Sequence, residues 1–190
     1  MMLRTLIYIS YLFLLLTSSP IMQYRTNSSS SSESMSFVSY NSKGFSENRQ
    51  RFLLEMIDDY DIILLQEHWL CDDQLGKLHS LHDSYSCHAV SGVDCSSDII
   101  SGRPFGGCAI FWKKSIKHNI SIIKPNSRRF IAISMTYHDT IILIINVYMP
   151  CDARQNVDEY ETILSDISNV ILEYKASFVI LGGDFNCDLD

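Results

Sequence analysis

The chain of 190 residues lacks several features that would place it in a specialised class of protein. Its six cysteines form no Cys-x-x-Cys pair, which argues against a structural zinc site. Basic residues number 15 against 22 acidic ones, so the chain does not fit a protein that binds nucleic acid by charge alone. No internal repeat is visible, and no apolar run reaches the ~20 residues that cross a bilayer.

What the chain does have is enough apolar sequence for one folded domain. Hydrophobic residues make up 46% of it, an ordinary share for a globular protein. A domain of this size with many apolar segments does not need disulfides, so we interpret the thiols as mostly reduced. We therefore expect an intracellular setting, nuclear or cytoplasmic, with no stable membrane partner. A basic stretch from Lys113 to Arg129 is a solvated face or, alternatively, a surface that faces phosphates.

The N-terminal region differs in composition from the rest. Residues 1–20 contain an apolar run, Leu6 to Leu16, with the length and flanks of a signal peptide, although Pro20 lies close to where cleavage would fall. The alternatives are spurious upstream sequence and, third, a membrane anchor; only a true signal peptide would make the protein secreted. Residues 21–35 are rich in serine and predict an unfolded linker. We expect the folded domain to occupy residues 36–190.

Hydrophobic periodicity predicts alternating strands and helices from residue 36 onward. A strand at Ser36 to Tyr40, a helix from about Ser46 to Tyr60 and a buried strand at Asp61 to Gln66 make a βαβ unit. The stretch Phe178 to Asn186 predicts a late buried strand that ends in two glycines. Further strands are expected at 85–90, 106–112, 120–123, 130–137 and 140–147, and helices at 72–81 and 152–175.

Polar residues follow the ends of these strands: Asn41, Glu67, Tyr148, and Asp184 with Asn186. Ligands of α/β sheets bind at that edge, so we expect these side chains to converge there. Carboxylate and amide groups together can hold a hard cation and orient an oxyanion. Each residue alone has a plainer interpretation. Glu67 could be a surface residue, Tyr148 a core tyrosine with a solvated hydroxyl, and the last pair part of an ordinary turn.

In their order and contexts these segments resemble the endonuclease/exonuclease/phosphatase superfamily of divalent-metal phosphodiesterases. The matching pieces are Ser39 to Gly44, Leu65 to Glu67, Asn146 to Pro150 and Gly183 to Asn186. Three segments look most like the endonuclease domain of non-LTR retrotransposons: Asn41 to Gly44, Leu64 to Leu70 and Gly106 to Trp112.

The resemblance implies an α/β fold, a four-layer sandwich, and Mg²⁺- or Mn²⁺-dependent hydrolysis that nicks DNA. It implies that Glu67 is the principal metal ligand with Asn41 beside it. Asp184 would orient or deprotonate the attacking water, and Asn186 and Tyr148 would contact the scissile phosphate. The partner would be DNA, bound through its phosphate backbone. In the parent element a reverse transcriptase would lie on the same polypeptide.

The resemblance covers Ser36 to the end of the chain and stops just after the Asn186 motif. The family has a second half with a terminal Asp-His pair, and no histidine of this chain lies in that part. His68 is assigned a role at the surface or behind Glu67. We therefore expect an incomplete sandwich whose missing half supplies the second sheet, and little or no nuclease activity from this truncated chain. The alternatives are a secreted or membrane-associated phosphodiesterase or phosphatase of the same superfamily, and a catalytically inactive binding remnant.

Overall fold

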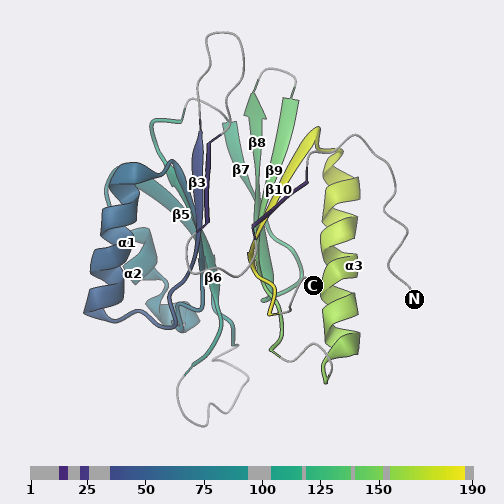
Figure 1. Cartoon of the computed structure of the whole chain (residues 1–190), viewed down its shortest axis with the longest axis horizontal. Helices are drawn as coiled ribbons and strands as arrows, with labels where there is room; N and C mark the ends of the chain where they lie inside the picture. The colour runs from purple at the N-terminus through teal and green to yellow at the C-terminus, as the bar shows by residue number, and fades with distance from the viewer. Residues whose placement is uncertain are drawn as a thin grey trace.

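The computed structural model describes residues 13–16, 22–25, 35–93, 104–116, 119–137, 140–151 and 155–186. Its strands form two five-stranded sheets that stack face to face (Figure 1). One sheet has the order β2 (Met22–Arg25), β3 (Ser36–Asn41), β4 (Ile62–Gln66), β6 (Cys108–Lys113) and β5 (Tyr85–Val90). The other has the order β1 (Phe13–Leu16), β10 (Phe178–Asp184), β9 (Thr140–Tyr148), β8 (Phe130–Tyr137) and β7 (Asn119–Ile123).

Helices cover both outer faces of this pair of sheets (Figure 1). The β3-containing sheet is covered by α1 (Glu47–Asp59) and by α2 (Gly76–His79), which a short 3-10 turn at Asp72–Gln74 precedes. The other sheet is covered by α3 (Val157–Tyr174). The layers are therefore helix, sheet, sheet and helix, which confirms the predicted four-layer α/β sandwich. Among the helices of the described residues, none is long and apolar enough to cross a membrane.

Strand β4 shows how the sequence pattern produces these layers. All five of its residues are buried, and successive side chains point to opposite faces of the sheet. Ile63 and Leu65 pack toward α1, whereas Ile62 and Leu64 face the other sheet. The apolar stripe of α1 that meets the outer face consists of Leu53, Met56 and Ile57.

The interior between the sheets corrects the expectation that a missing half supplies the second sheet. Strands β7 to β10 form that sheet within this chain. Its Ile131, Ile133 and Ile144 pack against Phe37 and Ile110 of the first sheet. The prediction was wrong because an apolar run indicates a buried strand without indicating which sheet the strand joins. Strand pairing between distant segments decides that.

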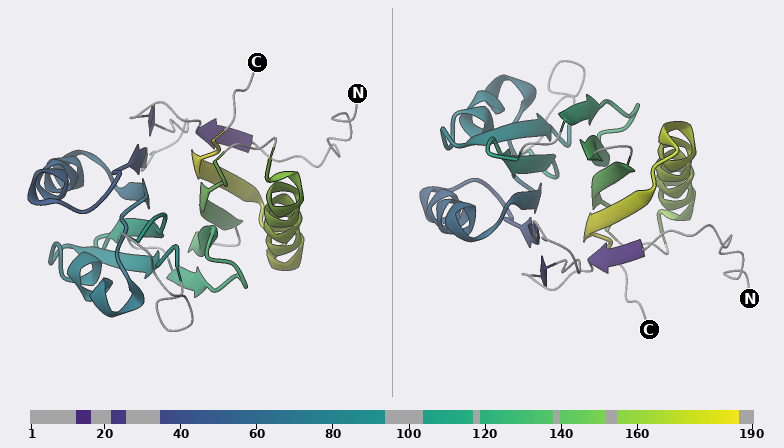
Figure 2. Two further views of the ribbon diagram at one scale, coloured as in Figure 1. Left: turned by 90° about the horizontal axis from the view of Figure 1, so that it is seen from below. Right: turned by 90° about the horizontal axis from the view of Figure 1, so that it is seen from above.

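Two short strands lie before Ser36, where the sequence predicts none. Strand β1 pairs in parallel with β10, and β2 pairs antiparallel with β3. Both are edge strands on the same side of the sandwich (Figure 2). A sheet edge offers unpaired backbone groups that any extended segment can satisfy, so no side-chain pattern is needed to place them. The domain boundary at residue 36 stays a prediction.

Candidate active site

The predicted strand ends meet at one edge of the sandwich. Asn41 ends β3 and Glu67 follows β4 in one sheet, while Asp184 ends β10 in the other. The side-chain amide of Asn41 donates from Nδ2 to Glu67 Oε1 at 2.7 Å and to Asp184 Oδ2 at 2.6 Å. All three side chains are only partly buried, so the cluster opens to the surface. The fold thus brings two carboxylates from two sheets to a single amide group.

Glu67 lies in a tight turn with unusual backbone angles. Glu67 and Trp69 both adopt left-handed conformations, with φ values of 55° and 56°. Such conformations are uncommon for residues other than glycine, and at functional sites they are held by surrounding contacts. Here the backbone N–H of Glu67 donates to Gly107 O at 2.8 Å, and that of Trp69 donates to Gly106 O at 3.0 Å. The start of the β6 segment therefore fixes the direction in which Glu67 points.

Between these two residues, His68 is fully buried and makes no hydrogen bond to Glu67 in the described structure. Its Nδ1 accepts from Leu70 N at 3.0 Å, so Nε2 carries the proton and donates to Val90 O at 2.9 Å. Burial lowers the pKa of His68 to about 4, against 6.5 ordinarily. The predicted surface role of His68 is wrong. It is a neutral core residue that anchors the turn, and the alternative, a role behind Glu67, is the one that fits.

Backbone N–H groups of two other residues also fix the position of Asp184. Its Oδ1 accepts the backbone N–H of Asn186 at 3.0 Å, and its carbonyl accepts from Met149 N at 2.8 Å. Asn186 itself has φ 47° and donates its side-chain amide to Met149 O at 2.7 Å. Asn186 thereby shapes the turn that carries Asp184.

Tyr148 lies directly beside Asp184 in the register of β9 and β10. Its side chain is nearly buried, with its hydroxyl 3.6 Å from Cys151 Sγ and the Arg129 guanidinium 5.8 Å from its ring centre. Burial raises the pKa of Tyr148, and the contact with Cys151 and the negative charge of Glu67 raise it further. The hydroxyl therefore stays protonated at neutral pH and can donate a hydrogen bond.

A sequence model of the endonuclease/exonuclease/phosphatase family matches residues 38–190. The chain belongs to this family. The match confirms the resemblance drawn from the four sequence segments. A search of curated proteins finds no match.

Several solved structures share the fold of this chain. A D. rerio TDP2 humanized by 14 mutations has a TM-score of 0.55 and 23% identity, covering 82% of this chain and 63% of its own. The 3' phosphatase NExo from Neisseria, bound to a product DNA hairpin, has a TM-score of 0.54 and 17% identity, covering 80% and 58%. The endonuclease domain of TRAS1, a telomere-specific non-LTR retrotransposon, has a TM-score of 0.52 and 13% identity, covering 80% and 59%. The chain thus spans less than two thirds of the length of these structures.

Behind the cluster of Asn41, Glu67 and Asp184 lies a buried polar network that the sequence analysis missed. Gln66 Nε2 donates to Asn146 Oδ1 at 2.6 Å, which joins the two sheets. Asn146 Nδ2 in turn donates to Leu65 O and Ala109 O, both at 2.8 Å. Ser39 completes the network through Gln66. The available signal was a polar residue in each of two otherwise apolar strands, because buried polar groups are retained where they have partners.

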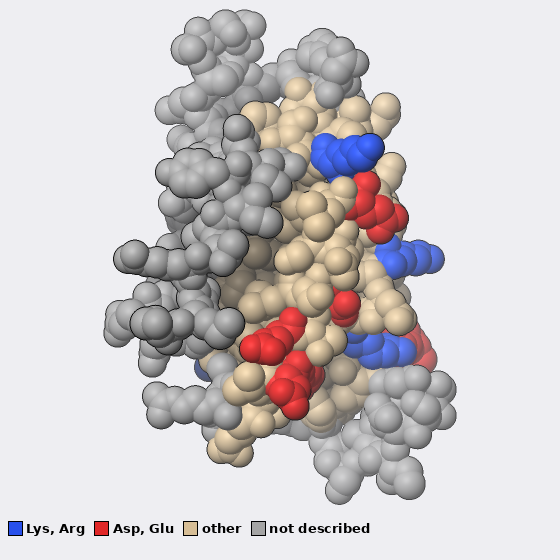
Figure 3. Space-filling view, turned by 90° about the vertical axis from the view of Figure 1, so that its right-hand side faces the viewer, with Lys and Arg blue, Asp and Glu red and all other residues tan. Residues whose placement is uncertain are grey.

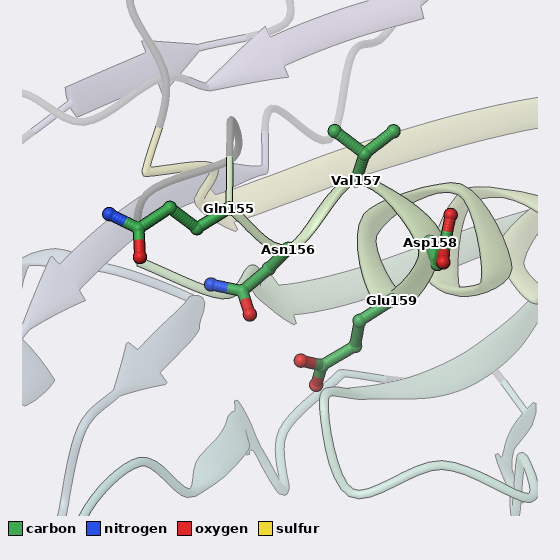
Figure 4. A pocket seen from close by; sticks show the side chains of 5 residues that line it. All are labelled: Gln155, Asn156, Val157, Asp158 and Glu159. Carbon is green, nitrogen blue, oxygen red and sulfur yellow. The ribbon is translucent and has the colours of Figure 1, made fainter.

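The basic stretch does not form a continuous surface of one sign in the described structure. Its members Lys113, Arg128 and Arg129 make ion pairs with Asp61, Asp72 and Glu159 respectively. On the side that α3 covers, acidic and basic groups are interspersed (Figure 3). A hollow of about 320 Å³ at the start of α3 is lined by 155–159 (Figure 4). None of the predicted site residues lines it.

Proposed function

We propose that this chain carries the metal-binding and water-activating groups of a divalent-metal phosphodiesterase that nicks DNA, of the non-LTR retrotransposon kind. The observation that carries the proposal is the convergence of Glu67 and Asp184 on the amide of Asn41. Membership of the endonuclease/exonuclease/phosphatase family supports hydrolysis of a phosphate ester. The fold similarity to NExo bound to a DNA hairpin and to the TRAS1 endonuclease domain favours a DNA substrate.

The residues present fit a hard cation. Two carboxylates ~4 Å apart repel by ~4 kcal/mol at an effective dielectric of ~20, so a positive group between them is favoured. Here the N–H groups of Asn41 occupy that place. The described residues include no cluster of three His, Cys, Asp or Glu side chains suited to a metal, but Mg²⁺ and similar ions need only one or two carboxylates and keep several waters. Glu67 would hold the ion with Asn41 beside it, and turning the Asn41 amide to present its oxygen would exchange the bond that Oδ1 now accepts from Lys43 N at 3.1 Å.

When bound, the cation would supply Lewis-acid stabilisation of charge on the phosphoryl or leaving oxygen. Asp184 would accept the proton of the attacking water. Its Oδ1 already accepts the backbone N–H of Asn186, so Oδ2, which contacts Asn41, is the oxygen that faces the site. Tyr148, which stays protonated, would donate to a phosphate oxygen, and Asn186 would contact the same phosphate.

The first test measures Mn²⁺ binding to the purified chain. The electron paramagnetic resonance signal of the free ion reports how much Mn²⁺ remains unbound. Glu67→Gln and Asp184→Asn should each weaken binding at least about tenfold because each removes a charge at the site. Two exposed acidic residues far from these positions in the sequence, Glu55 and Asp83, provide matched controls. Glu55→Gln and Asp83→Asn should bind Mn²⁺ with the affinity of the native chain. Undiminished binding by both site variants would refute the assignment.

The second test is magnesium-dependent nicking of supercoiled plasmid. Because the chain covers 63%, 58% and 59% of the solved structures described above, the assay is run on this chain and in parallel on a version extended by any sequence that follows codon 190 in the gene. That sequence also tests the proposed reverse transcriptase on the same polypeptide. Nicking by the extended chain that both site variants abolish would support the proposal.

The main alternative is a phosphodiesterase or phosphatase of the same family that acts on lipid head groups. The signal-like run Leu6 to Leu16 favours it, because such a segment would suit a secreted enzyme. Release of phosphate from lipid head groups without nicking of plasmid DNA would select this alternative.

A further inference from the structure

We infer that Trp69 is a positioning residue that holds the Glu67 carboxylate in the orientation needed to bind the cation. The inference rests on the proposed function and deepens it. The sequence patterns assign Trp69 no role at the site, whereas in the structure its indole contacts the Glu67 carboxylate.

The hydrogen bonds of the Glu67 carboxylate carry the first step. Oε1 accepts from Asn41 Nδ2 at 2.7 Å, and Oε2 accepts from the indole Nε1 of Trp69 at 3.2 Å. Asn41 cannot keep donating if its amide turns to present oxygen to a cation. The indole group carries a donor and no acceptor, so its bond to Glu67, unlike the bond from Asn41, requires no change of orientation when a cation binds. It is therefore the contact that persists between the two states.

The second step is that Trp69 is itself fixed. Its left-handed backbone is tied to Gly106, as described above, and the turn after β3 packs against its ring. A Cβ placed on Gly44 would lie 2.8 Å from Trp69 Cε3, so only glycine allows this approach. The backbone N–H of Gly44 also donates to Glu67 O at 2.7 Å. One turn thus holds both the backbone of Glu67 and the ring that orients its side chain.

The expected effect follows from what such supporting contacts do in metal sites. Losing the hydrogen-bond partner of a metal ligand typically costs 10- to 100-fold in metal affinity or activity. Trp69→Phe deletes the N–H and keeps an aromatic ring against Gly44. We expect Mn²⁺ to bind this variant about tenfold more weakly than the native chain.

Trp112, the only other tryptophan, gives the matched control. It pairs with Ile62 in the β4–β6 register, at the opposite end of β4 from Glu67. Trp112→Phe should therefore change Mn²⁺ affinity by less than about twofold. Circular dichroism and the thermal midpoint of each variant establish that it is folded before binding is compared.

The outcomes separate this inference from the proposed function. If Glu67→Gln weakens Mn²⁺ binding and Trp69→Phe does not, Trp69 has no positioning role while the metal site stands. If Glu67→Gln binds as the native chain does, the proposed function fails and this inference fails with it.

A measurement on the native chain covers the case in which Trp69→Phe does not fold. Bound Mn²⁺ should broaden the indole N–H resonance of Trp69 in the nuclear magnetic resonance spectrum and leave that of Trp112 sharp. Equal broadening of both signals, or of neither, would overturn the inference.

Discussion

At the scale of single residues, the site depends on a histidine that the fold keeps neutral. His68 lies between Glu67 and Trp69 with no exposed surface, and both of its ring nitrogens are committed to backbone partners. Charging this ring would place a cation in the core and would remove the acceptor that Leu70 N uses. The turn that presents Glu67 therefore depends on the protonation state of a residue that takes no part in the proposed chemistry.

The lowered pKa of His68 predicts how stability changes with pH. Below pH 6.5 the unfolded chain protonates this histidine, whereas the folded chain does so only near pH 4. The free energy of unfolding should therefore be unaffected above pH 6.5 and fall as the pH drops from 6.5 to 4. The loss is of order 3 kcal/mol, at about 1.4 kcal/mol per pKa unit.

Urea unfolding at several pH values between 7 and 4 measures this effect. His68→Gln should flatten the slope between pH 6.5 and 4. Burial lowers the pKa of His88 as well, so part of the slope should remain in the His68 variant. An unchanged slope in His68→Gln would show that the ring is not buried as a neutral group.

At the scale of elements, the Gln66–Asn146 contact sets the two sheets relative to each other. Gln66 comes one residue before Glu67, and Asn146 lies two residues before Tyr148 on the facing sheet. A shift of one sheet against the other would break this bond. It would also leave buried polar groups without partners, at about 1–3 kcal/mol each. The network therefore favours the one arrangement in which the site residues meet.

We predict that Asn146→Leu lowers the free energy of unfolding by about 2–4 kcal/mol, because it removes the hydrogen bonds to Leu65 O, Ala109 O and Gln66. Denaturant titration of Asn146→Leu, Gln66→Leu and the double variant measures the coupling. The double variant should lose less than the sum of the two single losses. Strict additivity would mean that the two side chains do not act as one network.

At the scale of the whole molecule, stability comes from the apolar layer between the sheets. Leu64 of β4 is completely buried there, among isoleucines of the facing sheet. Leu172 near the end of α3 is 62% exposed. Because the same leucine-to-alanine change is made at both positions, any difference in the free energy of unfolding reports the difference in burial.

Leu64→Ala should lower the free energy of unfolding by about 2–5 kcal/mol, since the cavity it leaves is enclosed on both sides. Leu172→Ala should change it by less than about 0.5 kcal/mol. Urea titration of both variants makes the comparison. Similar losses at both positions would mean that the two sheets are not packed together in solution.

From residue 36 onward, the sequence by itself determined which segments form strands and helices, because alternation along a strand and the 3.6-residue repeat of a helix are local properties. It also placed Asn41, Glu67 and Asp184 at the ends of buried strands, where an α/β fold collects polar groups. The resemblance to the endonuclease/exonuclease/phosphatase family is therefore visible in the sequence alone. The helix at 72–81 was the exception in detail, since it divides into a 3-10 turn and a short α-helix.

Only the tertiary structure decided that the second sheet forms from β7 to β10, that β1 and β2 pair at the edges, and that Trp69 meets Glu67. Each of these depends on contacts between segments far apart in the chain or on a turn with rare backbone angles. Neither leaves a periodic trace in the sequence. The element types follow from short-range geometry, whereas the site is a product of the way two separate sheets pack.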